Sequence, residues 1–544
     1  MNLLNLMKAK KSQRYLYLTM IIIVIIGIFL RFVNLDNKVY WHDEIYTTLH
    51  INGYGWDQWK TNVFTGKIIG VDTLQYYLHL NPNKTLADTL NILAKDDPHH
   101  PPLYYTLVRY WRQFFGDSIT IIRSFSAFVS LLILPAISWF SWELFGLHLV
   151  GIITIILVAI SPFFVLYAQE AREYALWTVF LILSNSSLLR AIKLTKNKVN
   201  LQKKDYLFWG IYSLSTMLSL YTSLVSIFVI ISQIVYLIFA QGFRITKIII
   251  LQGLALLISF ITFIPWILVF FGNYEQYETA TSWTRESTVS NLLLFQNLGL
   301  NLTRIFFDLD WRFYNLLTYL VVFGVLLLVV YALYFLYKNT SPKSWELIFA
   351  LIIIQLVFLF IPDLLWGGIR SISLRYLTPS VVAIDLAVAY LLSGKLIKHN
   401  TNPINIWSVI TIMIFSSGVI SCTINSQSDT SWSKYISSDL PLVSQIINAT
   451  NYPLLISNDQ SYHPGNIMAL SYLLKPDVKL QLLSEEKGYK IPDKFRNIFL
   501  LNPSDELRES LENQSGVKAK PIPSDHYIGL WKIELNHINY KISE

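Results

Sequence analysis

Residues 15–46 read YLYLTMIIIVIIGIFLRFVNLDNKVYWHDEIY, an apolar run that stops at Arg31 and is followed by the acidic pair Asp43 and Glu44. The run follows a basic stretch at the N-terminus, and no small-residue cleavage site comes after it. This pattern predicts a retained signal-anchor helix whose N-terminus lies in the cytoplasm. The two carboxylates then lie at the outer membrane surface, directly after the first helix.

The composition of the whole chain is that of a membrane protein. Hydrophobic residues make up 53% of the 544 positions and charged residues only 14%, which is unusual for a soluble globular chain. The net charge of +8 could suggest a nucleic-acid partner, but the basic residues gather in short segments between apolar runs. That is the positive-inside pattern, so we expect no nucleic-acid binding. The single cysteine, Cys422, excludes an intramolecular disulfide and a thiol-based metal cluster.

Basic segments set the expected topology. Those that lie between apolar runs are placed in the cytoplasm: 193–204, 244–247, 338–343 and 395–399. We predict a polytopic α-helical membrane protein with about 11 to 13 transmembrane helices. The predicted spans are 15–33, 119–144, 147–165, 173–192, 205–220, 222–240, 246–271, 312–337, 344–362, 377–394 and 404–423. The segment 101–115 is short and carries Arg109 and Arg112, so the parity of the crossings makes it re-entrant or interfacial.

Beyond Thr423 the composition becomes that of a small soluble domain. Strand-like runs and helical patterns alternate there, with strands at 453–457, 478–483, 497–501 and 527–533 and helices at 466–474 and 505–511. We therefore predict two domains. The first is a transmembrane domain at 1–423 that includes a large first outer loop at 34–100. The second is an α/β domain at 424–544 on the extracytoplasmic face.

Two acidic clusters are candidates for chemistry. Asp43 and Glu44 could take a proton from a hydroxyl or hold a cation, although acidic and aromatic residues also cap helix ends in the membrane interface. The second cluster stands just before a Pro-Pro pair that starts a helix. It consists of Asp96, Asp97, His99 and His100. Its His side chains could bind a phosphate when protonated, or Asp96, Asp97 and His99 could hold a divalent cation.

Two polar breaks between apolar runs place arginines at the predicted outer surface. Arg172 and Tyr174 lie in the first break, and Arg375 and Tyr376 lie in the second. The first break also contains Gln169 and Glu170. The positive-inside rule alone would assign these arginines to the cytoplasm, so their outward position favours a functional role such as neutralising a phosphate. The alternative is a loop whose charges pair with one another.

The order of these motifs resembles the GT-C class of polyprenyl-phosphate-sugar-dependent glycosyltransferases, especially the bacterial relatives of protein O-mannosyltransferases and of aminoarabinose transferases. The matching pieces span about residues 30–380 and are, in chain order, Arg31 to Leu35, Trp41-His-Asp43-Glu44, His100-Pro-Pro-Leu-Tyr-Tyr, Gly116-Asp-Ser with Arg123, Ser161-Pro-Phe through Gln169-Glu-Ala-Arg172-x-Tyr174, and Arg375-Tyr376-Leu-x-Pro379. The resemblance implies that the first outer loop roofs a cavity and that Asp43 is the catalytic base. Glu44 is adjacent and could exchange roles with it. The Trp-Trp-Asp-Tyr-Gly signature of the related oligosaccharyltransferases is missing, which disfavours en bloc transfer to asparagine.

The resemblance leads to an expected reaction. We expect Asp43 to take the proton of an acceptor hydroxyl, which attacks the anomeric carbon of the sugar with inversion while the lipid phosphate leaves. Arg172 and Arg375, and after them His99 and His100, are the expected contacts of that phosphate. The expected supporting residues are Asp97, Gln169, Glu170, Tyr174 and Tyr376. The expected partners are a polyprenyl-phosphate-sugar donor, an acceptor glycan, lipid or protein, and the lipids of a bacterial inner membrane. The sequence indicates no definite cofactor, although a divalent cation could be bound.

A polytopic transporter or lipid flippase is the alternative function. It predicts inverted repeats and polar groups near the middle of the membrane. No repeat is visible by eye, and the polar clusters gather at one membrane surface. Asp385 is the main exception, because it lies about eight residues inside a predicted helix, where an unpaired charge is costly. We expect it to pair with a polar group on a neighbouring helix.

The topology makes a labelling prediction. A cysteine placed in the 272–311 loop, in a chain whose Cys422 is removed, should react with a thiol reagent added outside intact cells. An Asn200→Cys variant should not react, because that segment is assigned to the cytoplasm. Reversed labelling would show that the predicted orientation is wrong.

Overall fold

The computed structural model describes residues 11–196, 198, 200–310, 316–398, 405–459, 464–484, 491–492, 494–514, 517–522 and 528–535. The chain divides into two compact units. Unit 1 takes in residues 1–35, 97–104 and 123–427, and unit 2 takes in residues 36–96, 105–122 and 428–544. Unit 2 therefore combines most of the first outer loop with the chain that follows residue 427.

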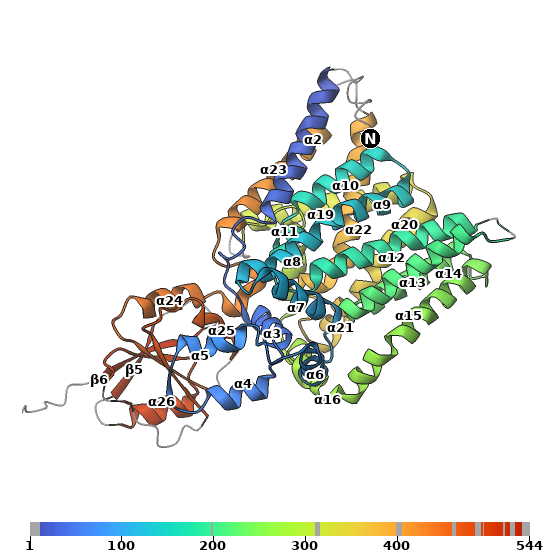
Figure 1. Ribbon diagram of the computed structural model, residues 1–544. Helices are drawn as coiled ribbons and strands as arrows, with labels where there is room; N and C mark the ends of the chain where they lie inside the picture. Colours follow the sequence, from blue (N-terminus) through green and yellow to red (C-terminus); the bar gives the residue numbers. More distant parts are fainter. Residues whose placement is uncertain are drawn as a thin grey trace, which may run out of the picture. The chain divides into compact units, whose positions relative to one another are not determined.

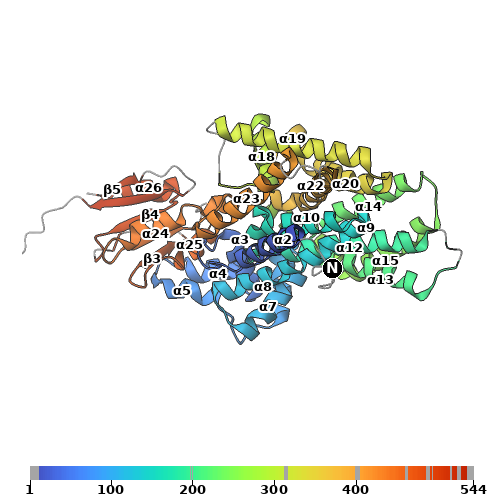
Figure 2. The ribbon, with the colours of Figure 1, turned by 90° about the horizontal axis from the view of Figure 1, so that it is seen from above.

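Unit 1 is built of helices (Figure 1). In chain order they are α2 (Lys11–Leu30), α8 (Ile119–Leu131), whose first turn belongs to unit 2, α9 (Ile133–Phe145), α10 (His148–Ile160), α11 (Pro162–Ala168), α12 (Tyr174–Thr195), α13 (Lys203–Thr222), α14 (Ser226–Ala240), α15 (Lys247–Gly272), α16 (Tyr274–Thr281), α17 (Trp283–Glu286), α18 (Asn291–Thr303), α19 (Leu316–Asn339), α20 (Pro342–Gln355), the π-helix η2 (Leu356–Phe360), α21 (Ile361–Trp366), the 3₁₀ turn η3 (Leu374–Leu377), α22 (Thr378–Lys398) and α23 (Ile406–Gln427). Figure 2 shows α12, α13 and α15 side by side.

The helices agree with the predicted membrane class. Among the described residues, seven helices are long and apolar enough to cross a membrane, or eight if the bent pair α10 and α11 counts as one span. The described part of each predicted span is mainly helical, although the spans 119–144, 147–165 and 344–362 each cover more than one helix. Residues 312–315 and 404 of two further predicted spans lie outside the described residues. The predicted total of about 11 to 13 spans goes beyond these seven or eight and stays a prediction.

The pair α10 and α11 bends by 57° at Ser161. Pro162 at the first position of α11 has no N–H to continue the hydrogen bonds of α10, so the last carbonyls of α10 need other donors. The buried guanidinium of Arg31 donates to Val158 O at 2.8 Å and to Ala159 O at 2.5 Å. The Cys422 thiol donates to Ile160 O at 3.2 Å. The last carbonyls of α10 thus accept hydrogen bonds from side chains at the end of α2 and on α23.

The prediction that Asp385 pairs with a polar group is wrong. Asp385 is completely buried in α22, and neither carboxylate oxygen has a hydrogen-bond partner among the described residues. One of the helices that pack against α22 is α10, which offers few partners because its only polar side chains are His148, at its first position, and Thr154. The Thr154 hydroxyl donates to its own helix, at Val150 O.

Unit 2 contains a mixed sheet with helices around it. Its elements are α3 (His42–Ile51), α4 (Trp56–Val63), β1 (Ile68–Gly70), α5 (Val71–Gln75), the 3₁₀ turn η1 (Tyr76–Leu78), α6 (Leu86–Asp96), α7 (Leu103–Phe115) from its third residue, the 3₁₀ turn η4 (Trp432–Ser437), α24 (Leu440–Asn448), β2 (Leu454–Asn458), α25 (Gly465–Ser471), β3 (Lys479–Leu483), β4 (Ile498–Leu501), α26 (Asp505–Glu512), β5 (Val517–Ile522) and β6 (Leu530–Leu535). Figure 1 shows α24 and α26 on opposite sides of the sheet.

The strands follow the order β1-β3-β2-β4-β6-β5. The central strands β3, β2 and β4 are parallel and almost entirely buried, as expected where helices cover both faces, while β1, β5 and β6 pair antiparallel. The core of the sheet contains Leu454, Ile456, Ile498, Leu500 and Leu507. The predicted C-terminal α/β fold is confirmed. The sequence analysis did not predict β1, which comes from the first outer loop and pairs Ile69 with Leu480 of β3.

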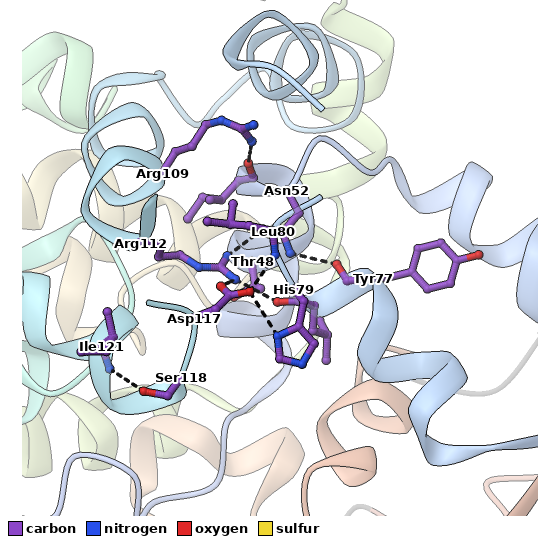
Figure 3. A network of polar contacts seen from close by, with 12 residues as sticks. Thr48, Asn52, Tyr77, His79, Leu80, Arg109, Arg112, Asp117, Ser118 and Ile121 are labelled. Atoms are coloured by element: carbon purple, nitrogen blue, oxygen red, sulfur yellow. Dashed lines mark hydrogen bonds and ion pairs between the residues drawn. The ribbon is translucent and has the colours of Figure 1, made fainter. Parts of the chain in front are cut away.

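Two buried arginines of α7 hold the first outer loop together (Figure 3). Arg109 donates to Ile51 O, to the Thr89 hydroxyl and to Lys84 O. Arg112 donates to Asn52 Oδ1 at 2.7 Å and to Leu78 O at 2.9 Å, and it pairs with Asp117. α7 is not one of the candidate spans, as the parity of the crossings predicts. Its charges bind loop carbonyls instead.

The network predicts that Arg112 stabilises unit 2. Arg112→Met would remove the donor of the buried Asn52 Oδ1 and of Leu78 O. It would also leave Asp117, which accepts a hydrogen bond from Leu80 N as well, without this cation. Leaving a buried acceptor without its donor costs about 1–3 kcal/mol for each group. We expect the thermal midpoint in detergent to fall by about 5 °C or more. Arg496→Met is the matched control, because Arg496 is an exposed residue of the same unit. Equal midpoints for both variants would contradict a structural role of the network.

Candidate active site

One cluster of unit 1 lies at the N-terminal end of α12. The backbone of residues 169–173 is not helical and carries buried polar side chains between α11 and α12. Arg172 Nη2 lies 3.2 Å from His100 Nε2, and Arg172 Nε lies 3.5 Å from Glu173 Oε2. The other carboxylate oxygen of Glu173 lies 3.4 Å from His100 Nδ1. Arg172, Glu173 and His100 therefore form a closed triangle of polar contacts.

Glu173 is an anion in this triangle. Burial alone would raise the pKa of its carboxyl group, but the Arg172 guanidinium and His100 outweigh burial and hold the pKa well below its usual range. A second arginine lies near the Tyr174 ring, which the Arg172 guanidinium also approaches.

That second arginine is Arg375, which lies in η3. Its guanidinium carbon lies 5.6 Å from the ring centre of Tyr174 and 5.3 Å from that of Tyr376. The guanidinium carbon of Arg172 lies 5.9 Å from the same Tyr174 ring. Cations at these distances are attracted by the face of an aromatic ring. The structure thus gathers around one tyrosine the two arginines that the sequence analysis selected from separate polar breaks.

Further residues surround this cluster. The Tyr167 ring packs edge-on against Tyr174 at 5.2 Å, and Glu170, Arg375 and Arg304 all act electrostatically on the Tyr167 hydroxyl. Arg304 is buried and donates to Asn301 Oδ1 at 2.8 Å.

The segment before α7 supplies the histidines. The His99 ring lies 4.2 Å from the His100 ring, and His99 Nδ1 lies 3.7 Å from Asp97 Oδ1. The Trp266 indole donates to Pro98 O and fixes this segment. Of the predicted phosphate contacts, His100, Arg172 and Arg375 belong to the cluster, and the His99 ring lies beside that of His100. Asp97, a predicted supporting residue, contacts His99.

Gln169 makes a different contact. Its amide nitrogen donates to Leu30 O at 2.8 Å and to Val33 O at 2.9 Å. These carbonyls terminate α2, so Gln169 holds the end of the first helix.

The two carboxylates after the first helix lie in unit 2, at the N-terminus of α3. Asp43 is half-buried, and Glu44 is completely buried. Glu44 Oε2 lies 3.1 Å from Nζ of Lys434, which is also completely buried. Two adjacent residues of the same chemical type thus have different environments, which is the usual way in which paired carboxylates acquire different roles.

Comparisons with known proteins show which proteins have a similar fold. The family model for dolichyl-phosphate-mannose-protein mannosyltransferase matches residues 99–268. ArnT from Cupriavidus metallidurans in the apo state superposes with a TM-score of 0.53 at 12% identity, over 96% of this chain and 98% of that chain. The same protein bound to undecaprenyl phosphate gives 0.52 at 11% identity, over 94% of this chain and 97% of that chain. This chain has the fold of the GT-C glycosyltransferases.

The oligosaccharyltransferase of Archaeoglobus fulgidus, tethered with an acceptor peptide, matches with a TM-score of 0.50 at 13% identity, over 85% of this chain. This chain spans only 64% of the length of that enzyme. A comparison with curated proteins gives no match. The predicted resemblance to the GT-C class is confirmed at the level of the fold.

The predicted cation ligands are not assembled in this GT-C fold. Among the described residues, no three His, Cys, Asp or Glu side chains form a group that could hold a metal ion. Asp96 Oδ2 accepts a hydrogen bond from Trp56 N at 2.8 Å, and burial raises the pKa of Asp96. Asp97 contacts His99 only at 3.7 Å. Asp96, Asp97 and His99 therefore do not supply a ready ligand set.

Sequence reasoning missed three polar residues of these clusters. The sequence analysis does not select Glu173, although Glu173 follows Arg172 directly. Arg304 lies in a segment assigned to the outer face, so the argument that selected Arg172 and Arg375 could have found it. Lys434 gave no signal, because a lysine beyond the last span looks like an ordinary surface residue.

Proposed function

We propose that the protein is a glycosyltransferase that moves a sugar from a polyprenyl-phosphate donor to an acceptor hydroxyl at the extracytoplasmic face of a bacterial inner membrane, with inversion at the anomeric carbon. The observation that carries the proposal is the pair of buried arginines, Arg172 and Arg375, on the Tyr174 ring. Two guanidinium groups on one ring supply charged N–H donors that suit an anionic leaving group.

The phosphate of the donor is the proposed partner of this charge. As the bond between the anomeric carbon and the phosphate oxygen breaks, negative charge grows on that oxygen. Arg172 and Arg375 stabilise it, and His100 adds a donor when protonated. Glu173 orients Arg172 through the 3.5 Å contact. Tyr174 and Tyr376 hold the guanidinium groups by their rings.

Asp43 is the proposed base. It takes the proton from the acceptor hydroxyl, whose oxygen attacks the anomeric carbon as the polyprenyl phosphate departs. A single displacement of this kind needs only one carboxylate base. The half-buried position of Asp43 supports this assignment over Glu44, which is buried against Lys434.

The lipid nature of the donor is supported by the fold. ArnT, which shares it, is described in complex with undecaprenyl phosphate. A polyprenyl tail can stay in the hydrocarbon layer while its phosphate reaches a polar cluster at the end of a span. The proposed sugar is a hexose or a pentose. The proposed acceptor is a hydroxyl group of a glycan, a lipid or a protein.

The transporter or flippase alternative has one observation in its favour, the buried Asp385 carboxyl in α22. Asp385 is a single carboxyl group and is the one observation that favours this alternative. The arginine cluster and the GT-C fold support the transferase.

The phosphate contacts can be tested at Arg375. Arg375→Lys keeps the charge but loses the planar fork that holds two phosphate oxygens, so affinity for undecaprenyl-phosphate mannose or aminoarabinose should fall, and Arg375→Ala should lower it further. Arg370→Lys is the matched control, because Arg370 pairs with Asp363 at 2.7 Å and has no proposed donor contact. If both Arg375 variants bind these donors as the parent does, Arg375 has no part in donor binding.

The base can be tested at Asp43. Asp43→Asn preserves the shape of the side chain and removes its ability to accept a proton. Turnover should drop roughly 10²-fold or more, in line with general-base contributions, while donor binding survives. Sugar release from radiolabelled donors, normalised to the amount of bound donor, is the measurement.

Glu44→Gln is the comparison variant and should lose less turnover than Asp43→Asn. If Glu44→Gln abolishes transfer and Asp43→Asn leaves it intact, the two roles are exchanged. Full transfer by both single variants and by the double variant would show that these carboxylates do not act in the reaction.

A further inference from the structure

The buried pair of Glu44 and Lys434 joins two distant parts of the sequence. The two residues are 390 positions apart, both are 0% exposed, and their charged atoms lie 3.1 Å apart. Charged groups are costly to bury unless they are paired and hydrogen-bonded. Neither residue can therefore lose its partner without a large penalty, and the first turn of α3 is held to η4.

Other contacts around the pair reinforce the same attachment. Lys434 Nζ lies 5.3 Å from the ring centre of Trp41, the residue that caps α3. The His42 backbone N–H donates to the Ser437 hydroxyl at 3.2 Å, and that hydroxyl donates to Asn466 Oδ1 at 2.6 Å. Trp41 and His42 precede Asp43 in the sequence, and Glu44 follows it. All three contact the C-terminal segment, residues 428–544.

The start of α25 approaches α3 closely. A Cβ atom added to Gly465 would lie only 2.7 Å from His42 Nδ1 and 3.1 Å from the Tyr46 ring. A larger residue at this position would force the His42 side chain to move. The first turn of α3 is therefore fixed from two sides, by η4 and by the start of α25.

We propose that Lys434 is a positioning residue for the transferase reaction: by pairing with Glu44 it fixes the first turn of α3 and thereby the direction of the Asp43 carboxylate. The proposal rests on the proposed function. It assigns to the C-terminal segment a direct part in preparing the base. Misplacing a reacting group by about 1 Å can cost 10²-fold in rate.

The experiment compares Lys434→Met, Lys434→Arg and the double variant Glu44→Gln/Lys434→Met with the parent. Lys434→Met leaves the Glu44 carboxylate buried without its cation, while the double variant removes both charges and should recover much of the lost folding yield. Turnover of undecaprenyl-phosphate mannose or aminoarabinose, per donor-binding site, should fall about 10- to 100-fold in Lys434→Met with the donor KM little changed. The double variant should stay slow, because the link is still missing, and Lys434→Arg should regain most of the rate.

Hydrogen exchange supplies a readout that needs no activity. The amides of α3 should exchange about tenfold faster or more in Lys434→Met, while those of α12 should keep the parent's rates. Lys60→Met is the matched control. Lys60 also links the first loop to the C-terminal segment, through a more exposed ion pair with Asp459 at 3.2 Å, and its loss should change neither readout.

The outcomes separate the possible failures. If Lys434→Met lowers only the yield of folded protein, with turnover per site and α3 exchange within twofold of the parent, the pair is a folding clamp and the positioning role is overturned. If the double variant recovers the parent's turnover, the link is not needed and the proposal is also overturned. If the parent releases no sugar from either donor but α3 exchange rises in Lys434→Met, the attachment of α3 stands and the proposed transferase function fails.

Discussion

The carbonyl groups at the end of α10 impose the constraint on which unit 1 depends. A helix that ends among buried residues leaves its last carbonyls without N–H partners, and carbonyls buried away from water need other donors. Arg31 and Cys422 supply the missing donors at Val158, Ala159 and Ile160. Because these donors come from α2 and α23, the break is possible only when both helices are in place.

The break has a consequence for the polar cluster. It turns the chain by 57° into the short α11, and the irregular segment that follows carries Arg172 and Glu173. Had α10 continued as one straight helix, these residues would fall on regular helical turns facing several directions. The interruption lets consecutive side chains contact His100 and Tyr174 together. α2 approaches α10 so closely that a Cβ added to Gly27 would meet the Ala159 carbonyl. This approach keeps the Arg31 side chain within hydrogen-bond distance of the α10 carbonyls.

Much of this architecture can be read from sequence, and the reason is physical. Apolar runs of sufficient length predict spans, and apolar runs between helical patterns predict the strands β2, β3 and β4. Arginines that the predicted topology assigns to the outer face stand out because they violate a general rule of charge distribution. The sequence could not predict β1, because three residues carry no periodicity and its partner β3 lies more than 400 positions away. The sequence also led to a wrong prediction for Asp385, because the side chains that face Asp385 depend on how the helices pack.

The two carboxylates after the first helix show where sequence reasoning ends. Asp43 and Glu44 are adjacent and chemically alike, so pattern alone leaves their roles interchangeable. The structure separates them, because Glu44 is completely buried and pairs with Lys434, 390 residues away, while Asp43 is half-buried. A charge committed to a buried pair is poorly suited to accept a proton, since protonation would leave the lysine unpaired. In the proposed mechanism, the contact that keeps Glu44 out of the chemistry therefore also anchors the helical turn that carries Asp43.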